Sequence, residues 1–137
     1  MHDLFVFTLS EDSSQNEIKT PVKLRNPLTS KEIACDAIWD TGATSSMISN
    51  TMASALSLKP TGQTSIVGVH GTNTARCYVV NLVFCNGVVL PEVKVAEASN
   101  VGGFGFLVGM DIIGRGVLHV DGTTRRLEVR FELPIQQ

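Results

Sequence analysis

Residues 37–43 read Ala-Ile-Trp-Asp-Thr-Gly-Ala, an apolar run that ends in a carboxylate, a hydroxyl and a glycine. The apolar run predicts a buried strand that delivers Asp40 to the start of a loop. Gly42 permits a close backbone approach, so its amide and that of Ala43 can point at the carboxylate. The hydroxyl of Thr41 can bond a neighbouring backbone group. A carboxylate in this position suggests acid/base activation of a water, which a single carboxylate does not perform efficiently alone.

Most of the remaining chain predicts β-strands, because short apolar and β-branched runs are separated by turn signals. Asn86-Gly87 and Asp121-Gly122 each lie between two such runs, and both dipeptides favour tight hairpins. The expected strands are residues 4–9, 20–24, 32–39, 66–67, 76–84, 88–96, 106–108, 117–120 and 127–131.

Only two segments favour helix. Residues 49–58 can form one, with Ser49 or Asn50 as its cap, and residues 110–113 can form a single short turn. Many short strands with frequent turns indicate a mainly β fold, a small sandwich or barrel with one or two short helices. The length of 137 residues suits a single domain over residues 1–137.

The composition is typical of a globular protein, with 43% hydrophobic and 18% charged residues. The net charge is -2 and the basic residues are scattered, apart from Arg125-Arg126 after a turn. We therefore expect no nucleic-acid partner. No apolar run approaches the roughly 18 residues of a membrane span, so no membrane partner is expected. The first residues lack a basic start and a long apolar core, which argues against a signal peptide and favours a cytoplasmic location.

The cysteines and histidines form no metal-binding pattern. Cys35, Cys77 and Cys85 make no Cys-x-x-Cys motif, and the three histidines are scattered without ligand spacing. We expect no metal and no organic cofactor. The cysteines lie in or beside strand-like runs, where small buried side chains are the expected role, and free thiols fit a reducing compartment.

The motif Asp40-Thr41-Gly42-Ala43 resembles the active-site loop of aspartic proteases. A second segment, residues 106–113, reads Phe-Leu-Val-Gly-Met-Asp-Ile-Ile. It resembles the apolar-apolar-glycine segment, followed by a short helix, that packs beside the catalytic loop in retropepsin-like proteases. The matching positions are Leu107, Val108 and Gly109.

A third element lies between two β runs, and it resembles the tip of the flap hairpin that closes over substrate in the same family. Its residues are Gly68, Val69, His70 and Gly71. The three elements span roughly residues 20–120 in the family's order. The resemblance implies a small closed β-barrel of the retropepsin type.

The resemblance also implies an aspartic endopeptidase. Asp40 would be the catalytic residue, in a loop completed by Thr41, Gly42 and Ala43. The substrate would be a peptide or protein segment in extended conformation, bound between the flap and the floor of the barrel. The chain carries one Asp-Thr-Gly triplet, whereas pepsin-type relatives carry two in a chain about twice as long. The second carboxylate is therefore expected from a homodimer.

The chain departs from the retroviral pattern in two places. Retroviral enzymes tend to carry an acidic residue just after the Asp-Thr-Gly-Ala run and an arginine after the second glycine. Those places hold Thr44-Ser45 and Met110, so the salt bridge between them is missing. The Gly-Met-Asp segment is closer to retrotransposon, bacterial or phage-encoded relatives.

Three alternatives remain open from the sequence. Asp111 could supply the second carboxylate within one chain, although an acidic side chain at the start of a short helix is the favoured interpretation. The chain could instead be a catalytically weak or inactive dimerisation or peptide-binding module. The dimer contact is expected to use the loop after Asp40 and a terminal strand, either residues 4–9 or residues 127–131.

Overall fold

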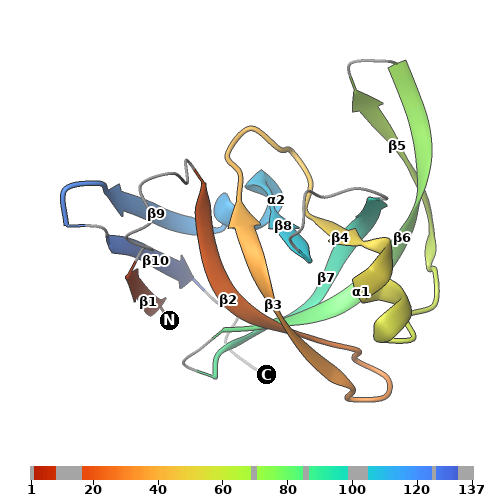
Figure 1. Cartoon of the computed structure of the whole chain (residues 1–137), viewed down its shortest axis with the longest axis horizontal. Helices are drawn as coiled ribbons and strands as arrows, with labels where there is room; N and C mark the ends of the chain where they lie inside the picture. Colours follow the sequence, from red (N-terminus) through yellow and green to blue (C-terminus); the bar gives the residue numbers. More distant parts are fainter. Residues whose placement is uncertain are drawn as a thin grey trace.

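The computed structural model describes residues 2–8, 17–68, 71–84, 87–98, 105–124 and 126–132, with the backbone alone at 2–8, 66–68 and 132. Two short helices and ten strands occur within these ranges (Figure 1). The strands are β1 (His2–Thr8), β2 (Ile18–Arg25), β3 (Glu32–Trp39), β4 (Met47–Ser49), β5 (Gly62–Gly68), β6 (Gly71–Val83), β7 (Val89–Ala98), β8 (Phe106–Val108), β9 (Gly116–Asp121) and β10 (Arg126–Glu132). The helices are α1 (Asn50–Ala55) and α2 (Met110–Ile113).

The main sheet has seven strands in the order β2-β3-β8-β4-β7-β6-β5. A further pairing between β2 and β6 closes the sheet into a ring, from which β5 and the start of β6 extend as a hairpin (Figure 1). A second sheet of three strands, β1-β10-β9, lies at one side of the ring. The predicted mainly β fold with two short helices is confirmed.

The core lies inside the closed sheet and continues under the second one. Trp39 of β3 stacks on Phe84 with ring centroids 6.3 Å apart, and Phe84 contacts Phe131 of β10 at 5.7 Å. These three buried rings join the two sheets. The indole nitrogen of Trp39 donates to the hydroxyl of Thr20 at 2.8 Å, so this buried polar group is satisfied.

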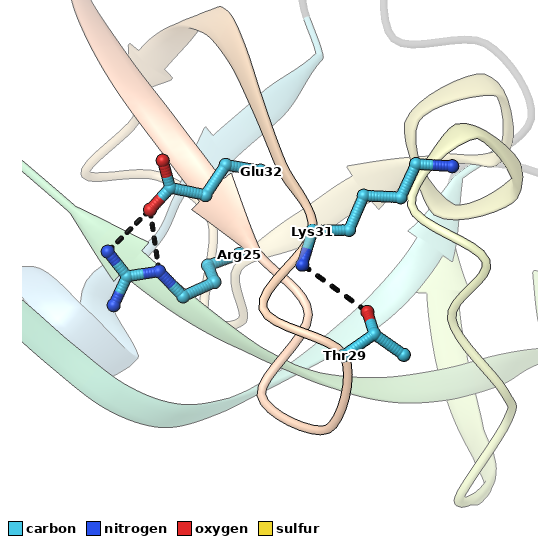
Figure 2. A network of polar contacts seen from close by, with 4 residues as sticks. All are labelled: Arg25, Thr29, Lys31 and Glu32. Atoms are coloured by element: carbon cyan, nitrogen blue, oxygen red, sulfur yellow. Dashed lines mark hydrogen bonds and ion pairs between the residues drawn. The ribbon is translucent and has the colours of Figure 1, made fainter.

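The turn between β2 and β3 fixes the register that carries Asp40 to its place. Arg25 and Glu32 pair at the strand ends through an ion pair, and the Lys31 amide donates to the hydroxyl of Thr29 at 3.3 Å (Figure 2). Buried Asn26 accepts from the amide of Leu28 at 2.9 Å within the same turn. The pairing runs from Arg25 opposite Glu32 to Ile18 opposite Trp39, so β3 ends directly before Asp40.

Four elements differ most from the expectation. The helix predicted at residues 49–58 ends at Ala55, and the strand predicted at residues 76–84 begins at Gly71. The sequence did not predict β4, because three residues are too few to establish a period-two pattern. The strand predicted at residues 66–67 begins earlier, at Gly62, and its first residues are polar and exposed. Backbone pairing with β6 sustains this part of β5, not burial of its side chains. No helix in the ranges given above is long and apolar enough to cross a membrane.

Candidate active site

Asp40 lies where β3 opens into a loop, and its backbone is held by β8. The two strands run parallel, with Ala37 opposite Phe106 and Trp39 opposite Val108. The Asp40 amide continues this ladder by donating to the carbonyl of Val108 at 2.9 Å. The side chain remains partly exposed. The catalytic-loop motif and the apolar-apolar-glycine segment, which are far apart in sequence, are therefore neighbours.

The carboxylate of Asp40 is oriented by its own loop. The Gly42 amide donates to Asp40 Oδ1 at 2.8 Å, as the sequence predicted. The expectation for Ala43 is wrong: its amide donates to the Asp40 carbonyl at 3.2 Å, because the chain closes a tight turn there. Thr41 lies exposed between them. A Cβ at position 42 would stand 3.2 Å from Asp40 Oδ1, so glycine leaves room for the carboxylate.

Gly109 allows the second segment to approach the loop closely. A Cβ at this position would lie 2.8 Å from the carbonyl carbon and oxygen of Ser45. The next residue, Met110, donates its amide to the carbonyl of Ala43 at 2.8 Å. The loop thus rests on the backbone of the segment that starts α2, with no space for a side chain between them.

Ser46 was not among the predicted site residues. This residue is completely buried, and its hydroxyl accepts from the Gly109 amide at 2.9 Å and donates to Asp111 Oδ1 at 2.7 Å. The Ser46 amide donates to Asp111 Oδ2 at 3.0 Å. Both carboxylate oxygens of Asp111 therefore accept hydrogen bonds from the loop. Nothing in the sequence marks this serine, because its partners lie more than 60 positions away.

Two of the predicted flap residues, Gly68 and Gly71, lie at the end of the hairpin formed by β5 and β6. Gly68 pairs with Gly71, whose φ of 110° is a backbone conformation that glycine adopts readily. Val69 and His70 lie outside the described residues. A hollow of about 250 Å³ is lined by residues of the loop after Asp40, of β5–β7 and of α2, among them Ser45, Ser46, Gln63, Thr64 and Asp111.

The chain matches the family model described as aspartyl protease over residues 26–112, which include the catalytic-loop motif and Gly109. The chain belongs to the aspartyl protease family. No curated protein matches the sequence of this family member.

Solved structures of aspartyl protease relatives share its fold. A retropepsin-like aspartic protease from Rickettsia conorii is 16% identical, with a TM-score of 0.67 over 96% of this chain and 92% of that one. EIAV protease in complex with an inhibitor is 18% identical, with a TM-score of 0.58 over 77% and 92%. The retroviral protease-like domain of Ddi1 from Leishmania major is 18% identical, with a TM-score of 0.53 over 86% and 94%. The retropepsin-like fold is thereby confirmed.

The cysteine thiols, the metal-ligating side chains and a second hollow are less suited to catalysis in this family member. Burial, followed by the charge of Asp36, raises the pKa of the Cys35 thiol to about 11, so this thiol is a poor nucleophile. Cys77 is buried, and Cys85 lies outside the described residues. In the described ranges no three metal-ligating side chains lie together. A larger hollow of about 810 Å³ beside α1 contains none of the predicted site residues.

Proposed function

We propose that this chain is an aspartic endopeptidase whose catalytic dyad consists of Asp40 from two copies of the chain. The observation that carries the proposal is the hydrogen bond from the Gly42 amide to Asp40 Oδ1 at 2.8 Å. This bond orients a partly exposed carboxylate, while Val108 fixes the backbone beneath it. Membership of the aspartyl protease family supports the same assignment.

Two adjacent carboxylates give the chemistry that hydrolysis needs. Like charges at close range disfavour double ionisation, so the pair holds one proton between them. The ionised carboxylate takes a proton from a water lying between the two, and this water attacks the peptide carbonyl. The protonated carboxyl donates its proton to the carbonyl oxygen. Thr41 would stiffen the loop by hydrogen bonding across the dimer, and Gly42 would align the substrate backbone.

The second carboxylate comes from another copy because this chain offers no equivalent. The chain has one Asp-Thr-Gly triplet. Both carboxylate oxygens of Asp111 accept hydrogen bonds from Ser46, which favours a role for Asp111 in holding the loop. Two-fold symmetric association would bring Asp40 against its own mate.

The dimer surface proposed here includes α2 and β9. Residues 127–131 were one candidate contact, but β10 lies between β1 and β9 and both of its edges are paired. Within the described part of the chain, the outer edges of this sheet belong to β1 and β9. Of the large apolar side chains that are exposed among the described residues, Met110, Val117 and Val120 lie on α2 and β9. The Met110 amide also donates to the Ala43 carbonyl at 2.8 Å, so α2 adjoins the loop after Asp40.

The substrate would be a peptide or protein segment in extended conformation. It would lie between the β5–β6 hairpin and the catalytic loop, with its backbone hydrogen-bonded as an added strand. Gly68, Val69, His70 and Gly71 would cover it as the flap. The hollow of about 250 Å³ beside Ser45 would receive one of its side chains.

Activity against a mixture of denatured proteins, followed by mass spectrometry from about pH 4 to 7, tests the proposal. The wild-type chain should cleave, and Asp40→Asn, which keeps the shape of the side chain, should not. Equal cleavage by both would contradict the assignment of Asp40. Absence of cleavage by a chain that sedimentation shows to be dimeric would favour a peptide-binding module instead.

A further inference from the structure

The loop after Asp40 is attached to the rest of the molecule at three points. At its start, the Asp40 amide donates to Val108, and in its middle the Ala43 carbonyl accepts from Met110. At its end, Ser46 bonds both Gly109 and Asp111. The first two attachments are between backbone groups. The third is made by side chains, so substitution can remove it without altering the backbone itself.

The third attachment is a network around one buried hydroxyl. Ser46 Oγ accepts from the Gly109 amide at 2.9 Å and donates to Asp111 Oδ1 at 2.7 Å. The Ser46 amide donates to Asp111 Oδ2 at 3.0 Å, and the Ser46 carbonyl accepts from the Ala96 amide at 3.2 Å. Hydrogen bonds to a carboxylate are shorter and stronger than bonds between neutral groups. The side-chain bonds of this network therefore hold the loop end to α2, and the separate backbone bond to Ala96 holds it to β7.

No ion pair between the two segments can substitute for this network. The neighbouring positions are Thr44, Ser45 and Met110, which are uncharged. Met110 is exposed, with 41% of its surface accessible. Gly109 increases the dependence on Ser46. A Cβ at position 109 would lie 2.8 Å from the backbone of Ser45, so the two segments approach closely and position 109 has no side chain that could hold them together.

We propose that Ser46 and Asp111 are positioning residues for catalysis, which hold the Asp40 loop at the geometry required for the dyad. This inference rests on the proposed function. The two residues act through the loop backbone and not on the reacting atoms. Displacement of a reacting group by about 1 Å can cost a factor of about 100 in rate, so loss of one loop attachment should affect turnover strongly.

The test compares Ser46→Ala, Asp111→Asn and the double variant with Tyr78→Phe. Tyr78 is a matched control because it is a buried residue whose hydroxyl also donates to a carboxylate, that of Glu97, at 2.7 Å in a partly buried bond. It lies in β6, outside the proposed catalytic machinery. Asp111 is largely exposed, so Asp111→Asn should fold even if Ser46→Ala does not.

With a peptide that the wild type cleaves, kcat should fall roughly 10- to 100-fold in Ser46→Ala, and less in Asp111→Asn, which keeps one acceptor oxygen. KM should change by less than about threefold, since the loss is in positioning. The double variant should resemble Ser46→Ala, because the two residues act as one unit. Tyr78→Phe should keep kcat within about twofold of the wild type, even at an equal loss of thermal stability.

Amide hydrogen exchange gives a second readout that does not need turnover. The Gly42 and Ala43 amides should exchange at least about tenfold faster in Ser46→Ala and Asp111→Asn than in the wild type or Tyr78→Phe. Wild-type kcat in Ser46→Ala and Asp111→Asn, or an equal loss of kcat in Tyr78→Phe, would overturn the proposal. If the wild type shows no Asp40-dependent cleavage, the proposed function fails. Unchanged exchange of the Gly42 and Ala43 amides in Ser46→Ala and Asp111→Asn would separately overturn the role of these two side chains in holding the loop.

Discussion

The absence of a side chain at Gly42 determines where the Asp40 carboxylate can lie. A Cβ there would stand 3.2 Å from Asp40 Oδ1, the oxygen that accepts from the Gly42 amide. Gly42→Ala should push the carboxylate a few tenths of an ångström from its place. We expect peptide hydrolysis to fall about tenfold or more, measured as kcat/KM.

Gly122→Ala is the control for this change. A Cβ at Gly122, in the turn between β9 and β10, would meet nothing within 4 Å. Its activity should stay within about twofold of the wild type. Equal activity of Gly42→Ala and Gly122→Ala would show that the contact at Asp40 does not constrain the carboxylate.

Tyr78 is the single tyrosine of the chain, so its titration can be followed directly by tyrosinate absorbance. Burial, and then the hydrogen bond to Glu97, raise the pKa of Tyr78, while Arg76 opposes them. The folded protein therefore holds the phenol proton more tightly than the unfolded chain. The resulting stabilisation is present below the ordinary tyrosine pKa of about 10 and is lost as pH rises through the folded value.

The prediction for Tyr78 is an absorbance midpoint above that of the chain in denaturant. The free energy of unfolding should also fall more steeply above about pH 10 in the wild type than in Tyr78→Phe. Both proteins contain the same lysines, so subtracting one pH dependence of the free energy of unfolding from the other cancels the contribution of lysine titration. A midpoint equal to that of the denatured chain would contradict the effect of burial.

At the scale of the elements, the β2–β3 turn is attached to the end of α1 by one side chain. The amide nitrogen of buried Asn26 donates to the carbonyl of Leu56 at 3.0 Å, and its oxygen accepts from Leu28 at 2.9 Å. Asn26→Ala would leave both partners unsatisfied. We expect a loss of about 2–3 kcal/mol in the free energy of unfolding, measured by urea denaturation.

Thr29→Ala is the matched control in the same turn, since it removes the exposed bond from the Lys31 amide seen in Figure 2. It should cost less than about 0.5 kcal/mol. If the two variants lose equal stability, the effect comes from the turn conformation and not from the link to α1.

The sequence predicts some elements well and others poorly, for physical reasons. β3, β8 and α2 have the predicted bounds, because buried apolar residues mark their ends and a glycine follows β8 and α2. β5 could not be bounded, because its first residues are exposed and only pairing with β6 defines them. Asp40 is marked by its local motif. Ser46 is not, because its role depends on Gly109 and Asp111, which only the fold brings near.

At the scale of the whole molecule, β9 and the hairpin of β5 and β6 lie at different sides of the closed sheet (Figure 1). The three-stranded sheet ends in β9, whose exposed valines follow α2 along the chain (Figure 1). The hairpin of β5 and β6 extends from another part of the ring, beyond the catalytic loop. A second copy that covers α2 and β9 would therefore leave the hairpin able to fold over a bound peptide.

Val117→Asp tests this arrangement of the proposed dimer. Val117 has 58% of its surface exposed on β9, so the substitution should leave the monomer folded, while a buried charge in the interface should weaken association by roughly 10- to 100-fold. Activity should then depend steeply on protein concentration and recover when the concentration is raised. Leu28→Asp, at an even more exposed apolar residue in the β2–β3 turn, should change neither association nor activity. Sedimentation velocity and initial rates over the same concentration series measure both quantities, and unchanged association in Val117→Asp would exclude β9 from the interface.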